Sequence, residues 1–168
     1  MREYAHRALP LVMSGGDVDL QAIPHDGSHL TPDQARTIDA YLIEALDALN
    51  LGNWRVYVGK DLPPEHAVLS IFPGDGRRIA ILTVTADWWT SRTSDEKRVD
   101  ITHECLHLAH HDTDEHVRRF FDGSGDISDY VKSLFLEQFK TDLERMVDTL
   151  SYSAAALLPP WPDEQPAA

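Results

Sequence analysis

The amino-acid sequence predicts an α+β fold with an N-terminal helix, a small mixed or antiparallel sheet of about three to four strands, and two further helices. Three observations support this prediction. Apolar residues recur every three or four positions between residues 31 and 50, three short β-type runs lie between residues 54 and 85, and two more helical patterns follow residue 93. A chain of 168 residues is long enough to bury the core of one such domain without disulfides.

The first helix is predicted to begin at Thr31-Pro32. The threonine can serve as the N-cap, and the proline occupies the first helical position, where its missing N–H is not needed. From there an apolar stripe continues to about Asn50 and consists of Ile38, Tyr41, Leu42, Ala45, Leu46 and Leu49. This spacing is typical of a helix that packs one face against a core.

Three strands are expected over residues 54–58, 67–72 and 78–85, with glycine- and proline-containing segments between them. The Pro-Gly-Asp-Gly segment at 73–76 is typical of a hairpin, so the second and third strands are predicted to be antiparallel neighbours. The third strand is long and is expected to lie near the site that the domain carries.

The second helix is predicted to open at Thr93-Ser-Asp-Glu96, which has the capping-box pattern, and to end near His111. The polar residues 112–129 are then expected to form a connection. An unbroken apolar stripe over 131–150 predicts the third helix.

Composition limits the class of protein. We interpret the chain as an N-terminal arm (1–30), one domain (31–158) and a disordered tail (159–168). With 15 Lys and Arg against 28 Asp and Glu the net charge is −13, which argues against nucleic acid or an anionic membrane surface as the partner. The sequence has no long apolar run and no signal-peptide pattern, and its single cysteine, Cys105, cannot form an internal disulfide. These features predict a cytoplasmic protein.

The pattern His103-Glu104-Cys-Leu-His107 lies in the second predicted helix and carries the chemistry. Histidines four residues apart on a helix project to one side and can share a Zn²⁺ ion. Glu104 lies beside them, within reach of a water molecule held by that metal. Two neutral nitrogen ligands, an open metal position and a carboxylate that accepts a proton are what metal-assisted hydrolysis needs.

A third ligand must come from another part of the chain, and Glu144 in the third helix is the preferred candidate. The apolar stripe that contains Leu143 and Val147 would press this helix against the second one and point Glu144 at the metal. Asp148, one turn later, could then orient a ligand histidine by accepting its other N–H.

With these residues the sequence resembles the zincin metallopeptidases, and among them the small gluzincin-like type, in which HExxH on one helix is completed by a glutamate from a later helix. Compact bacterial and bacteriophage chains of this type are known, and the likeness in layout covers residues 54–157. It depends on His103, Glu104, His107 and Glu144, and on Asp148 four residues further on. The resemblance implies a zincin-like fold whose edge strand, here 78–85, lies above the metal and accepts a peptide by β-augmentation.

The expected function is therefore that of a zinc-dependent peptidase, with His103, His107 and Glu144 as ligands and Glu104 as general base. Tyr152, one turn beyond Asp148, is the candidate donor to the oxyanion. Two alternatives remain open from the sequence. The first is a non-catalytic zincin-like protein that binds metal in a structural or interaction role, and the second is a SprT-like protease in which His116 is the third ligand.

Overall fold

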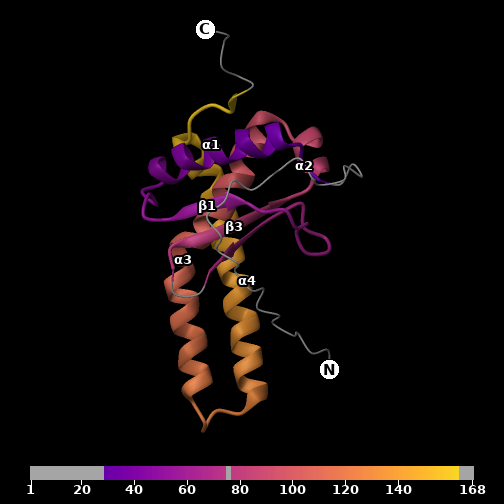
Figure 1. Cartoon of the computed structure of the whole chain (residues 1–168). Coiled ribbons are helices and arrows are strands. Elements are labelled where there is room, and N and C mark those ends of the chain that lie inside the picture. Colours follow the sequence, from indigo (N-terminus) through magenta and orange to yellow (C-terminus); the bar gives the residue numbers. More distant parts are fainter. Residues whose placement is uncertain (1–28, 75–76, 163–168) are drawn as a thin grey trace.

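The computed structural model describes residues 29–74 and 77–162 (Figure 1). Its elements in chain order are α1 (Pro32–Ala48), β1 (Arg55–Val58), β2 (Leu69–Pro73), β3 (Ile79–Val84), α2 (Ala86–Ser91), α3 (Ser94–Gly123), α4 (Asp129–Ala154) and a 3₁₀ turn (Ala155–Leu157). Within these residues, four α-helices and one small sheet confirm the predicted α+β class. All but the last two positions of the predicted arm 1–30 lie outside the described residues.

The sheet is mixed, and its strand order is β1-β3-β2. β2 and β3 are antiparallel, as the hairpin signal predicted, whereas β1 pairs with β3 in parallel. The expectation that strand 78–85 lies at an edge is therefore wrong, because β3 is the central strand. Its position suits its composition, since Ala80, Leu82, Thr83 and Val84 are all buried. The edges are formed by β1 and β2.

α1 and α3 begin where the sequence predicts. Thr31 caps α1 and Thr93 caps α3, and in each case a reciprocal hydrogen bond with the side chain three residues on completes a capping box. The buried face of α1 consists of Ile38, Tyr41, Leu42, Ala45 and Leu46. This face packs on the sheet and on α3 and forms one side of the core.

α3 is much longer than predicted. It continues past His111 to Gly123, so most of the expected connection over 112–129 is helical and only residues 124–128 join it to α4. The polar stretch contains no glycine or proline before Gly123, and ion pairs between residues four apart, Arg118–Asp114 and Arg119–Glu115, support the helix.

α3 and α4 lie side by side and extend away from the sheet as a two-helix hairpin (Figure 1). Ser128 caps α4, and the helix includes the whole apolar stripe over 131–150. Because α4 packs mainly on α3, only Val147 and Ser151 of its described side chains are buried. In the part of the chain that the structure describes, no helix has the combination of length and apolar character needed to cross a membrane.

Two segments differ from the sequence prediction next to the core. α2, which was not predicted, is a short helix capped by Thr85 that buries Trp88 completely. The predicted disordered tail 159–168 is wrong over its first residues, because Trp161 is fully buried against Tyr41 and Trp88. The Tyr41 hydroxyl also donates to the carbonyl of Pro159 at 2.9 Å. Residues 163–168 lie outside the described part of the chain.

Candidate metal centre

α3 places both histidines of the HExxH pattern on one face. They are one helical turn apart, and the Nε2 atoms of His103 and His107 are 3.1 Å from each other. Both side chains are about one-fifth exposed, at 22% each, so they are accessible from a cavity and still held by their neighbours. The predicted ligand pair is therefore assembled by local helix geometry alone.

α4 brings Glu144 to this pair, as predicted. Its Oε2 atom lies 3.7 Å from Nε2 of His103 and 3.5 Å from Nε2 of His107. Val147, one turn further along α4, is fully buried and fixes the side of the helix that faces α3. Within the described residues, His103, His107 and Glu144 form the one group whose ligand atoms are close enough together to hold a metal ion.

The dimensions of this group fit a small tetrahedral metal. Zn²⁺ binds nitrogen and oxygen at about 2.0–2.2 Å, so two ligands of a tetrahedral site lie about 3.3–3.6 Å apart. The three distances between the candidate ligand atoms, 3.1, 3.5 and 3.7 Å, lie within or close to this range. Burial lowers the pKa of His107, which favours the neutral imidazole that binds a metal, although the charge of Glu144 opposes this effect.

Asp148 contacts the far side of one ligand. Its Oδ1 atom lies 3.1 Å from Nδ1 of His103, and Nε2 of the same ring lies 3.7 Å from Oε2 of Glu144. A carboxylate at this distance accepts the Nδ1 hydrogen and so holds the tautomer with a free Nε2. This is the contact that the sequence predicted for Asp148.

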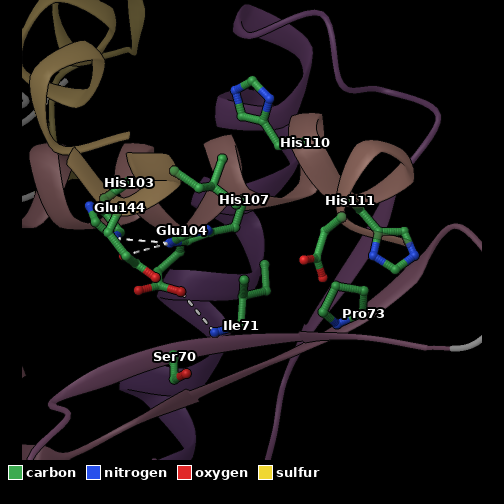
Figure 2. Close-up of a pocket in the computed structure, with 11 residues that line it drawn as sticks. Ser70, Ile71, Pro73, His103, Glu104, His107, His110, His111 and Glu144 are labelled. Carbon is green, nitrogen blue, oxygen red and sulfur yellow. Dashed lines mark hydrogen bonds and ion pairs between the residues drawn. The ribbon is translucent and has the colours of Figure 1, made fainter. Parts of the chain in front are cut away.

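Glu104 faces the same cavity without belonging to the ligand group. Its Oε2 atom accepts a hydrogen bond of 2.8 Å from the backbone N–H of Ile71 in β2 (Figure 2). Burial raises the pKa of Glu104 to about 7, and the Ile71 hydrogen bond limits this rise. A divalent cation beside it would favour the ionised form again. The Ile71 hydrogen bond therefore fixes the position of the carboxylate, and burial makes it more basic than an exposed glutamate.

β2 is the sheet edge beside this centre, which corrects the edge strand inferred from the family resemblance. The N–H of Thr85 donates to the carbonyl of Val68, and the N–H of Gly74 donates to the carbonyl of Ile79. Alternation along an antiparallel pair then turns the backbone groups of residues 69, 71 and 73 away from β3. At this outer edge the N–H of Ile71 is held by Glu104, and Pro73 has no N–H to offer.

A cavity of about 360 Å³ joins these elements. α3 supplies one wall, β2 a second and α4 a third, and the lining residues are Ser70, Ile71, Pro73, His103, Glu104, His107, His110, His111, Asp114, Leu143 and Glu144 (Figure 2). The arrangement brings together three side chains that could hold a metal ion, a carboxylate beside them that is not part of this group, and a cavity between a sheet edge and two helices.

Two predicted residues are not brought into this arrangement. His116 is exposed on α3 nine residues after His107, which places it about 13.5 Å further along the helix axis, so it cannot complete the same metal site. Tyr152 is 73% exposed and does not line the cavity, so its role as oxyanion donor remains a prediction. Sequence reasoning missed the backbone N–H of Ile71, which no side-chain pattern signals.

Comparison of the chain with protein-family models, with curated proteins and with solved structures gave no match.

Proposed function

We propose that this protein is a zinc-dependent peptidase of a minimal zincin-like type. The observation that carries the proposal is the combination of a His103, His107 and Glu144 ligand group with a carboxylate, Glu104, that faces the same cavity and is not a ligand. A purely structural metal site has no use for such a carboxylate. Hydrolysis needs one, because a proton must leave the attacking water and reach the departing amine.

His103, His107 and Glu144 would hold the metal. When bound, zinc supplies a Lewis acid that polarises the scissile carbonyl and makes a water molecule more acidic. Glu104 accepts the proton of the attacking water and then delivers it to the leaving nitrogen. The N–H of Ile71 keeps the Glu104 carboxylate directed into the cavity, and Asp148 keeps His103 oriented toward Glu144.

The substrate enters along the outer edge of β2. In the part of the chain that the structure describes, the backbone groups of this edge without a hydrogen-bond partner are the N–H and C=O of residue 69 and the C=O groups of residues 71 and 73. An extended peptide can pair with some of these groups but cannot form a full ladder, because Glu104 holds the N–H of Ile71. Side-chain contacts in the cavity therefore carry part of the binding.

Glu104→Gln tests the proposal. The zinc-loaded variant and the wild type are incubated with a mixture of peptides, and cleavage is followed by mass spectrometry. We expect cleavage by the wild type, unchanged zinc content in the variant, and a loss of cleavage of at least about a hundredfold, since general acid and base catalysis contributes that much. Glu137→Gln, at an exposed position of α4, is the matched control and should cleave normally.

Two outcomes would contradict the proposal. Equal cleavage by wild type and Glu104→Gln would remove the general-base role. Stoichiometric zinc in a wild type that cleaves none of the peptides would favour a non-catalytic, metal-binding role instead.

A further inference from the structure

We infer that Asp114 makes this cavity selective for peptides with a lysine or arginine close to the scissile bond. The inference rests on the proposed peptidase function and adds the substrate class. It depends on the position of Asp114 relative to the metal centre, on the sign of the charges in the cavity and on the ion pair that Asp114 makes with Arg118.

Asp114 lies on the same face of α3 as the metal ligands. It follows His107 by seven residues, which is close to two full helical turns, so both side chains point to the same side. His110 and His111 lie between them, and all four residues line the one cavity. The cavity therefore continues along α3 from the ligand group to the Asp114 carboxylate.

The distance suits a long cationic side chain. Seven residues of helix advance about 10.5 Å. Each residue of an extended peptide advances about 3.3 Å, so a lysine or arginine one or two residues from the scissile bond can reach Asp114. Pro73 and Leu143 line the same cavity and offer apolar surface to the methylene groups of that side chain.

The Asp114 end of the cavity favours a cation. Among the described residues that line the cavity, Glu104, Asp114 and Glu144 are acidic, four are histidines, and none is a lysine or an arginine. A divalent metal would more than balance the charge of Glu144, and Glu104 is engaged by Ile71 and by the reaction. Asp114 is the acidic residue of the lining that the proposed mechanism leaves without a task, and its side chain is only 28% exposed.

Asp114 already has a partner, which gives the inference a second test. Its Oδ2 atom accepts a hydrogen bond of 2.8 Å from Nε of Arg118, whose side chain is half exposed and does not line the cavity. A carboxylate has about four lone-pair positions, so it can accept from a second cation at the same time. Arg118 nevertheless weakens the attraction, and its removal should strengthen the preference for a basic side chain.

The experiment measures binding in a variant that does not turn over. Glu104→Gln protein loaded with zinc is titrated against a series of fluorescent peptides. Each peptide carries one lysine, at a different position, and has no other charged side chain. Each peptide is paired with a twin that has acetyl-lysine at that position, and anisotropy gives both affinities. We expect one position, or two adjacent ones, where lysine binds about fivefold more tightly than acetyl-lysine, the size of a partly exposed ion pair.

The supporting result has three parts. Adding Asp114→Asn reduces the ratio of the lysine affinity to the acetyl-lysine affinity to about one, and adding Arg118→Gln raises this ratio above fivefold. Adding Glu115→Gln leaves it unchanged, because Glu115 has the same charge and the same kind of pair, with Arg119, but does not line the cavity. This control separates a local effect of Asp114 from the general attraction of an acidic protein for cations.

Three results would overturn the inference. The first is equal affinity for lysine and acetyl-lysine at every position, and the second is a preference for lysine that persists in Asp114→Asn. In both cases normal cleavage by the wild type leaves the proposed function intact. If no peptide binds and the wild type cleaves none, the proposed function fails and this inference fails with it.

Discussion

Asp148 offers a test of the metal centre that leaves all three ligands in place. Its Oδ1 atom is 3.1 Å from Nδ1 of His103, and this contact directs Nε2 of the same ring toward Glu144. Removing such an outer partner of a metal ligand lowers affinity about 10- to 100-fold. Because the Asp148 side chain is 66% exposed, we expect the lower end of this range for Asp148→Ala. The expected loss is about tenfold, or about 1.4 kcal/mol.

The assay is a competition for zinc against a chromophoric chelator at pH 7. Asp148→Asn keeps an oxygen that can accept the Nδ1 hydrogen and should lose less affinity than Asp148→Ala. Asp142→Ala is the control, since Asp142 is an exposed acid on the same helix that contacts Arg145 instead of the ligand group. Wild-type affinity in Asp148→Ala, or an equal loss in Asp142→Ala, would refute the idea that Asp148 acts through His103.

Three further predictions concern the core and its titratable groups. Burial raises the pKa of Cys105 to about 12, so a thiol reagent such as DTNB should react with it only when the protein unfolds. Fast labelling of the native protein would be inconsistent with this burial. Trp161→Ala should lower the free energy of unfolding, measured by urea titration, by about 3 kcal/mol. This value is near the low end for a buried tryptophan, because the indole N–H of Trp161 is buried without an acceptor among the described residues. A loss below about 1 kcal/mol would show that the segment does not pack as described. Burial raises the pKa of Asp39 above 3.8 despite its hydrogen bond from the Val58 N–H, so the folded state binds the carboxyl proton more tightly than the unfolded state does. The contribution of Asp39 to stability therefore falls as the pH rises from 3.8 through the raised pKa. Asp39→Asn keeps an oxygen acceptor without the charge, so it should be more stable than wild type at pH 7. The difference should shrink as the pH falls from the raised pKa of folded Asp39 to the ordinary value of 3.8, and it should level off below that value. A constant difference at all pH values would exclude a titration effect.

Local signals in the sequence predicted the helix starts well. The N-cap at Thr31 and the capping box at Thr93 were predicted from residues next to the helix start, and the structure contains both. The end of α3 was predicted too early because polarity near residues 112–123 was interpreted as a loop. Helix formation there depends on pairs such as Arg118–Asp114 and on the lack of a helix breaker, which polarity alone does not report.

Long-range features of the fold were the ones that sequence reasoning missed. The central position of β3 depends on its parallel pairing with β1, which no local pattern encodes. Trp161 lies in a proline-rich segment whose composition suggests disorder, but its indole finds a place between Tyr41 and Trp88. In both cases tertiary packing decides the outcome.

The candidate site was predicted more completely than the fold around it. His103 and His107 follow from helix geometry, and Glu144 follows from the apolar positions Leu143 and Val147, which predict the side of α4 that faces α3. The position of Ile71 could not be predicted, because the partner of Glu104 is a backbone N–H. Asp114 was assigned to a connection, and its place in the cavity became evident only with the true length of α3.

The central claim is that His103, His107 and Glu144 bind one metal ion together. It is tested most directly by elemental analysis of wild type and Glu144→Ala, both purified without added metal, with Glu137→Ala as an exposed control on the same helix. We expect about one zinc per chain in the wild type and the control, and a strong loss in Glu144→Ala. Full zinc content in Glu144→Ala, or no metal in the wild type, would contradict it.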